Sequence, residues 1–110
     1  MSVKLEQKRC EPCSGNTPAL SATQVSEFER QLDPAWTVVD QHHLQRDFTF
    51  DDFRQALDFV NRVGEVAEAE QHHPDILLTY GKAQVQLWTH AIDGLSENDF
   101  IVAAKVDRLL

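Results

Sequence analysis

A proline separates two stretches of this chain that have different hydrophobic periods. Before Pro74, apolar residues recur every three or four positions, which predicts one face of a helix (Phe53, Leu57, Val60 and Val63, with Ala56 and Ala67 beside them). After it, apolar residues occupy every second position, which predicts a strand (Ala83, Val85 and Leu87). Because the residue before a proline is pushed toward an extended conformation, the helix should end near Glu70 and not pass through His73.

Helix and strand signals come in blocks along the first half of the chain. Ser21 and Gln24 have the spacing of a capping box and should begin a helix that ends at Pro34, with an apolar face of Val25, Phe28 and Leu32. Residues 36–50 predict two short strands with a turn near residues 40–43. The long helix should begin at Thr49 or Phe50, with two acidic residues in its first turn (Asp51 and Asp52).

The second half predicts a hairpin and a final helix. Residues 75–92 should form the hairpin, with its turn at residues 80–83. Ser96 and Asp99 again have capping-box spacing, and the helix that follows has an apolar side (Phe100, Ala103, Ala104, Val106 and Leu110). The order α-β-β-α-β-β-α predicts an α+β fold in which helices pack on one face of a four-stranded antiparallel sheet.

Length and charge limit the classes of protein that remain. A chain of 110 residues fits one domain, and its polar, turn-rich residues 1–20 predict an irregular arm before a single domain of residues 21–110. The net charge of −8 argues against a nucleic-acid partner and against an anionic membrane surface. No apolar run approaches the ~20 residues that span a bilayer, and the first residues lack an apolar signal core, so we expect a soluble cytoplasmic protein.

Two cysteines, Cys10 and Cys13, stand in the arm with the spacing CxxC. This spacing occurs in redox pairs and in half of a zinc site. The residues after this pair predict irregular chain, whereas a redox pair usually opens a helix, and no second CxxC completes a zinc site. We therefore expect the cysteines to belong to a tethered arm without metal or redox chemistry.

The five histidines include two adjacent pairs. For His72 and His73, followed by Pro74, three interpretations are open: metal binding, proton transfer and a solvated loop. Adjacent side chains in an extended segment point apart, so a shared metal ion is disfavoured. Imidazole titrates near neutral pH, and His90, predicted at the end of a strand beside Trp88, could complete an acid–base group. Two carboxylates, Glu68 and Asp99, could orient the imidazoles, whereas His42 and His43 are expected to be solvated turn residues.

The spacing of these residues resembles that of the pterin-4a-carbinolamine dehydratases. The matching elements are Glu68, then His72, His73 and Pro74, then Tyr80, His90 and Asp99, with Trp36, the Thr89–His90 pair and residues 94–99 in agreement. The likeness extends from about residue 8 to 110. It implies the fold expected above and the dehydration of 4a-hydroxytetrahydrobiopterin to a quinonoid dihydropterin, without a metal or another cofactor. The substrate would come from an aromatic amino acid hydroxylase such as phenylalanine hydroxylase, and the protein would be a homodimer or homotetramer.

The resemblance also implies roles for individual residues. His72, His73 and His90 would be catalytic. Our hypothesis within this group is that His72 and His90 serve as acids on the two sides of the pterin ring and that His73 chiefly binds it. The expected substrate-binding and orienting residues are Asp99, Glu68, Trp36 and Thr89, with Trp36 as a flat apolar wall. Two alternatives stay open: a module that stabilises the dimer of a transcription factor, as animal members do, and a pterin-linked regulator without catalysis.

Overall fold

Four strands form one antiparallel sheet in the computed structural model, which describes residues 4–12 and 15–110. The strands are β1 (Thr37–Val39), β2 (His43–Thr49), β3 (Asp75–Thr79) and β4 (Lys82–Leu87). Their order across the sheet is β1-β2-β4-β3, and every neighbouring pair is antiparallel. The helices are α1 (Ala22–Glu29), α2 (Phe53–Glu70) and α3 (Glu97–Asp107), with the short 3-10 helices η1 (Leu5–Gln7) and η2 (His90–Ile92).

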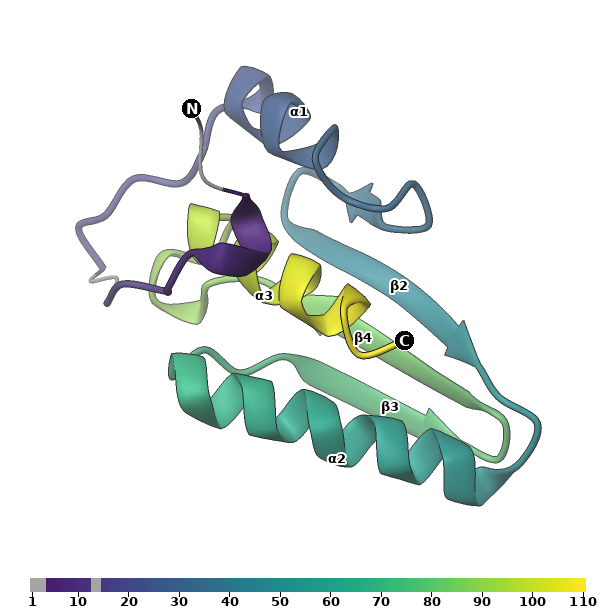
Figure 1. The fold of residues 1–110 in the computed structure, drawn as a ribbon. Coiled ribbons are helices and arrows are strands. Elements are labelled where there is room, and N and C mark those ends of the chain that lie inside the picture. The colour runs from purple at the N-terminus through teal and green to yellow at the C-terminus, as the bar shows by residue number, and fades with distance from the viewer. Residues whose placement is uncertain (1–3, 13–14) are drawn as a thin grey trace.

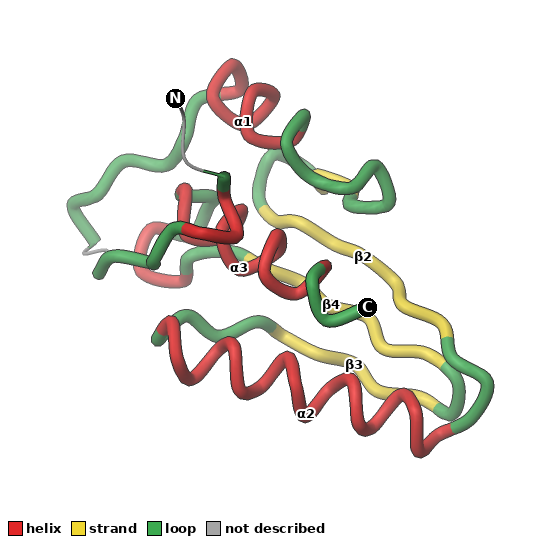
Figure 2. The backbone as a smooth tube through the Cα atoms, in the orientation of Figure 1, coloured by secondary structure: helices red, strands yellow, loops and turns green. Residues whose placement is uncertain are grey.

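All three α-helices lie on the same face of the sheet (Figure 1). Figure 2 shows α2 running beside β3, α3 crossing the middle of the sheet, and α1 over the β1–β2 end. The core lies between this layer and the sheet, and α3 is buried on most of its surface, from Phe100 to Val106 except Lys105. The predicted α+β class, element order and one-sided helix layer are confirmed.

Helix α2 ends where Pro74 predicts but begins later than expected. Its first residue is Phe53, because the side chain of Asp52 accepts a hydrogen bond from Gln55 N–H and caps the helix. The buried face consists of Ala56, Phe59, Val63 and Ala67. The predicted stripe was therefore wrong at Phe53, which is exposed, and at Leu57, which is only half-buried.

The outer helices differ from the predictions at their ends. Helix α1 begins with the predicted Ser21–Gln24 capping box but stops at Glu29, before Pro34. Leu32 is still buried, although it lies in a turn and not on the helix. In α3 the Ser96–Asp99 capping box is confirmed, whereas Leu110 lies beyond the helix and is exposed.

One charged side chain lies on the helix-covered face of β2. Arg46 alternates with Leu44 and Phe48 along the strand, and its guanidinium lies over the Phe48 ring, 4.5 Å from the ring centroid. Its Nη1 donates to Asp107 Oδ1 of α3 at 2.9 Å. Burial, partly offset by hydrogen bonds from Trp36 and Arg46, raises the pKa of Asp107. The pair joins the sheet to the last turn of α3.

The N-terminal arm is anchored at its root. Leu5, in η1, is 3% exposed and belongs to the hydrophobic core. The Nζ of Lys105 on α3 donates to the Glu6 carbonyl at 3.1 Å, and Lys8 pairs with Glu97 at 2.6 Å. Within the described ranges, no helix is long and apolar enough to cross a membrane.

Candidate active site

All three histidines of the predicted group line one pocket. Its volume is about 560 Å³, and it lies at the end of the sheet where α2 and β4 both finish. His72 and His73 come from the segment after α2, and His90 from η2, directly after β4. A fourth contribution comes from the N-terminal arm, through residues 9–12.

The chain path after α2 makes the two adjacent imidazoles diverge. Gln71 has a left-handed backbone, with φ of 53°, and the N–H groups of Gln71 and His72 both bond to the Ala67 carbonyl. Pro74 follows, and β3 begins one residue later. The side chain of His72 therefore turns inward to Asp99, whereas that of His73 turns outward to Glu68.

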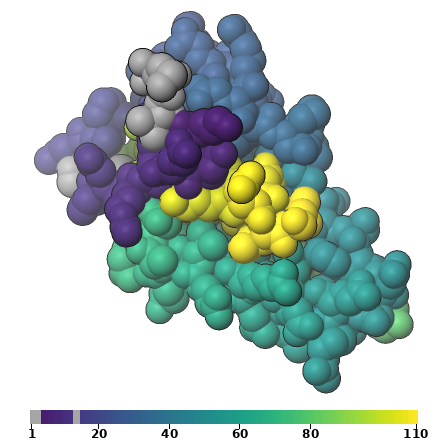
Figure 3. All heavy atoms as spheres, in the orientation of Figure 1, coloured from purple at the N-terminus to yellow at the C-terminus, as the bar shows by residue number. Residues whose placement is uncertain are grey.

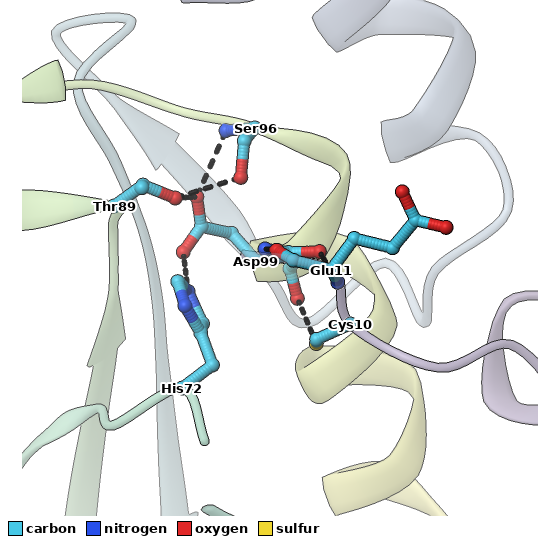
Figure 4. A network of polar contacts seen from close by, with 7 residues as sticks. Cys10, Glu11, His72, Thr89, Ser96 and Asp99 are labelled. Atoms are coloured by element: carbon cyan, nitrogen blue, oxygen red, sulfur yellow. Dashed lines mark hydrogen bonds and ion pairs between the residues drawn. The ribbon is translucent and has the colours of Figure 1, made fainter. Parts of the chain in front are cut away.

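Asp99 lies completely buried at the centre of a hydrogen-bond network (Figure 4). Its Oδ1 contacts His72 Nε2 at 2.6 Å, and its Oδ2 accepts hydrogen bonds from the Thr89 hydroxyl and the Ser96 N–H, each at 2.9 Å. The Thr89 hydroxyl has one hydrogen, which goes to Asp99, so the Ser96 hydroxyl donates to Thr89 across 2.7 Å. Every oxygen of the carboxylate is thus satisfied without water.

This network determines which nitrogen of His72 exchanges protons. A carboxylate oxygen only accepts hydrogen bonds, so Nε2 of His72 carries the hydrogen that faces Asp99. Nδ1 is then the atom with a lone pair in the neutral ring and with a proton in the charged ring. Asp99 is therefore placed to fix the tautomer and the orientation of His72, as carboxylates do for histidines in other sites.

The second carboxylate, Glu68, lies 2.5 Å from His73, from Oε2 to Nε2. This pair is exposed, with 56% of the His73 side chain and 75% of the Glu68 side chain accessible. Exposed ion pairs contribute little to stability because water competes for both partners. The contact orients the His73 ring at the rim of the pocket.

The wall beside His90 is aromatic. The ring centroids of Trp88 and His90 lie 4.5 Å apart. The ring centroids of His42 and His43 lie 5.4 and 5.9 Å from that of Trp88. His42 also contacts Asp93 at 2.8 Å. The expectation that His42 and His43 are solvated was wrong, because both are half-buried against Trp88.

Two residues of the sequence motif lie elsewhere. Trp36 is 3% exposed, is absent from the pocket lining, and donates from Nε1 to Asp107 at 2.9 Å, so it is a core residue. Tyr80 lies exposed in the β3–β4 turn. Trp88 was not predicted as a wall of the site, although the sequence placed it beside His90 at the end of a strand.

The arm wall contains a thiol and a carboxylate. Burial first, and the nearby Glu70 charge second, raise the pKa of Cys10 from 9.0 to about 12. The neutral thiol excludes thiolate chemistry for Cys10 at neutral pH. Burial opposes ionisation of Glu70, but a hydrogen bond from Cys10 N–H and the charges of Lys105 and Arg9 lower the pKa of Glu70 overall. Cys13 lies outside the described residues, so the CxxC interpretation is untested.

The chemistry of this pocket is that of imidazoles and carboxylates. In the part of the chain that the structure describes, no group of three or more His, Cys, Asp or Glu residues is arranged to hold a metal ion. Three imidazoles, one with a fixed tautomer, can give and take protons around a flat ligand that stacks on an indole.

Comparisons with known proteins point to one family. Residues 18–109 match the family described as pterin 4 alpha carbinolamine dehydratase. A Rubrobacter xylanophilus protein named "Putative pterin-4-alpha-carbinolamine dehydratase" is 56% identical over 106 residues, which are 96% of this chain and 98% of the relative. An Alkaliphilus metalliredigens protein of the same name is 50% identical over 94% of each chain. The crystal structure of a transcriptional coactivator/pterin dehydratase from Brucella melitensis has a TM-score of 0.77 at 33% identity, over 83% of this chain and 97% of the other.

Proposed function

Since the chain belongs to the pterin-4a-carbinolamine dehydratase family, we propose that it dehydrates 4a-hydroxytetrahydrobiopterin to quinonoid dihydropterin by histidine acid–base catalysis. The observation that carries the proposal is the convergence of His72, His73 and His90 on one pocket of about 560 Å³. That volume is within the usual range of small-molecule sites.

The reaction needs one proton delivered and one removed. The lone pair of N5 forms a double bond to carbon 4a as the bond from that carbon to the hydroxyl oxygen breaks. Hydroxide leaves poorly, so an acid protonates it and water departs. A base removes a proton from the ring nitrogen, which leaves the neutral quinonoid product. General acid–base catalysis of this kind typically contributes 10²–10⁴-fold to the rate.

The contacts of the three histidines support different roles. His72 and His90 lie as acids on the two sides of the ring: the one on the side of the hydroxyl donates its proton, and the other, in its neutral form, accepts the ring proton. His73 chiefly binds the pterin. Asp99 holds the proton of His72 on Nε2, so Nδ1 is the atom that meets the substrate. Glu68 orients His73 at the rim. Thr89 acts through Asp99, because its hydroxyl is buried and directed at that carboxylate.

The wall that stacks on the pterin is Trp88 and not Trp36. The indole of Trp88 lines the pocket next to His90, whereas Trp36 is held in the core by Asp107. An aromatic face favours a flat heterocycle through offset stacking.

The substrate and product define the protein's place in metabolism. A 4a-hydroxytetrahydropterin is what an aromatic amino acid hydroxylase such as phenylalanine hydroxylase releases, and the quinonoid product is ready for reduction. We place the enzyme in this recycling step, in the cytoplasm, as a homodimer or homotetramer. The exposed Leu77 on the edge strand β3 supports self-association, and light scattering of the purified protein measures the oligomeric state.

A direct assay tests the proposal. A phenylalanine hydroxylase generates the carbinolamine, and its decay is followed in the ultraviolet with and without this protein. We expect a rate above the spontaneous one, in proportion to enzyme concentration. An unchanged decay rate, with protein shown to be folded by circular dichroism, would overturn the enzymatic function and favour a binding or regulatory role.

A further inference from the structure

Residues 8–12, which we call the strap, form one wall of the pocket that contains the histidines. Four strap residues line this pocket, Arg9 to Pro12. Figure 3 shows the N-terminal segment lying directly on α3 and reaching the end of α2. The strap therefore joins the two helices whose ends carry His72 and Asp99.

Hydrogen bonds connect the strap to both helices. The N–H of Cys10 donates to Glu70 Oε1 at 2.8 Å, and Glu70 is two residues before His72. The N–H of Glu11 donates to Asn98 Oδ1 at 3.0 Å, and Asn98 Nδ2 donates back to the Glu11 carbonyl at 2.6 Å. Asn98 directly precedes Asp99, so the strap is bonded within two residues of each member of the His72–Asp99 pair.

The Glu70 carboxylate, which accepts the hydrogen bond from the strap, is buried and paired with a positive charge. The Glu70 side chain is 7% exposed, and Lys105 lies 3.5 Å away as its counter-charge. A hydrogen bond to a buried carboxylate is stronger than one between neutral groups. The same Lys105 donates to the Glu6 carbonyl, which ties the root of the arm to this charge pair.

The strap precedes the residues that match the family. The family match begins at residue 18, and the Brucella structure is covered over 97% of its own length by 83% of this chain. The Rubrobacter relative, in contrast, aligns over 106 residues, 96% of this chain, a span that includes residues 8–12. The strap therefore lies outside the residues of the family match and inside the span shared with the Rubrobacter relative.

We infer that the strap is a substrate-positioning element: it narrows the pocket around the bound pterin and holds the end of α2 in place through Glu70. The inference rests on the proposed function, because it assumes a pterin in this pocket. It assigns the strap to binding and not to proton transfer, since the Cys10 thiol is directed at the Asn98 carbonyl, 3.6 Å away, and the Cys10 N–H is bonded to Glu70.

Two pairs of full-length variants test this role. Glu70→Ala removes the acceptor for the strap, whereas Glu70→Gln keeps an acceptor oxygen and removes only the charge. Leu5→Ala loosens the root of the arm, and Leu32→Ala is the matched control because it truncates a buried leucine that is absent from the pocket lining. Two quantities are measured: steady-state kinetics, and the dissociation constant of a non-reacting dihydropterin.

The expected result is a change in binding with little change in turnover. Loss of a hydrogen bond to a charged group should raise KM and the dissociation constant about tenfold in Glu70→Ala. Leu5→Ala should show a rise in the same direction, and Glu70→Gln a smaller rise than Glu70→Ala because its acceptor oxygen is neutral. Leu32→Ala should stay close to the wild type.

The outcomes separate this inference from the proposed function. A wild type that binds and turns over the pterin, with unchanged binding in both Glu70→Ala and Leu5→Ala, overturns the strap role alone. An inactive wild type that still binds the dihydropterin refutes the enzymatic function, and the dissociation constants then decide on the strap. A wild type that binds no pterin overturns both. If pterin binding is weakened equally in Leu5→Ala and Leu32→Ala, the effect comes from lower protein stability, and the strap role is overturned.

Discussion

Nε2 of His72 meets Oδ1 of Asp99 at 2.6 Å, and Asp99 has no solvent-exposed surface. A buried carboxylate is costly unless its partners satisfy it, and here an imidazole, a hydroxyl and a backbone N–H do so. The same residue caps α3 through the Ser96 N–H. The cap of α3 and the orientation of the His72 imidazole thus depend on one side chain.

Asp99→Asn should lower kcat by roughly 10–100-fold, the usual effect of removing a partner that orients a functional histidine. Asparagine keeps the shape but offers one acceptor oxygen where the carboxylate offers two. The matched control is Asp107→Asn, on the same helix but outside the pocket lining. It should lose stability, through weaker bonds to Trp36 and Arg46, yet keep kcat. Equal kcat losses in both variants would contradict the orienting role of Asp99.

Substitutions of the three histidines should give different kinetic patterns. His72→Gln and His90→Gln should each lower kcat by about 10²–10⁴-fold, the usual contribution of a general acid or base. His73→Gln should chiefly raise KM, because its ring lies at the exposed rim beside Glu68. Steady-state kinetics of the three variants separate these effects. If His73→Gln reduced kcat as much as the other two, the division of roles would be wrong.

Binding of a pterin should change the fluorescence of one of the two tryptophans. Trp88 lines the pocket, and Trp36 is buried against Asp107. A dihydropterin stacked on the indole should quench Trp88. In a titration, Trp36→Phe should keep the response, and Trp88→Phe should lose it together with part of the affinity, about 0.5–1.5 kcal/mol for an aromatic pair. A response that persists in Trp88→Phe would place the ligand elsewhere.

Local signals predicted the elements and part of the site. Pro74 correctly indicated the end of α2, and both capping boxes mark true helix starts. The resemblance also named Asp99 and Glu68 as partners of the imidazoles, and each of these carboxylates contacts one of them. These features depend on residues that are neighbours along the chain or belong to one spaced motif.

Features that depend on distant partners were not predicted. The predicted face of α2 included Ala56, Val63 and Ala67 correctly but omitted Phe59. Phe53 and Phe59 are equally apolar, and the packing on Phe48 and Phe50 selects Phe59. The role of Trp36 depends on Asp107, 71 residues away. The strap was expected to be an irregular, tethered arm, and its role in the pocket was not predicted because its partners, Glu70, Glu97 and Asn98, lie 60 to 89 residues away in the sequence.

Gln41→Gly should stabilise the protein by about 0.5–1 kcal/mol, because side chains are strained in the left-handed region that glycine adopts freely. Asp40 and Gln41 both have this backbone in the β1–β2 turn, with φ of 53° and 56°. Gln41→Ala keeps the strain and is the control, with little expected change. Urea denaturation measures both variants. Equal stability of the glycine and alanine variants would show that the turn is not strained.

Cys10 should react with iodoacetamide about a thousandfold more slowly than an ordinary thiol near neutral pH, because a rise in pKa from 9.0 to about 12 reduces the thiolate a thousandfold. Peptide mapping of a Cys13→Ser variant follows this one site. Since the folded pKa is raised, the stabilisation by the neutral thiol is complete below pH 9 and is lost as the pH rises from 9 toward 12, where ionisation favours unfolding. Cys10→Ala should therefore lose less stability than the parent over that range. Leu5→Ala should accelerate the alkylation of Cys10, because it loosens the strap. If Cys10 of the parent protein were alkylated as fast as a free thiol, the strap would not bury Cys10.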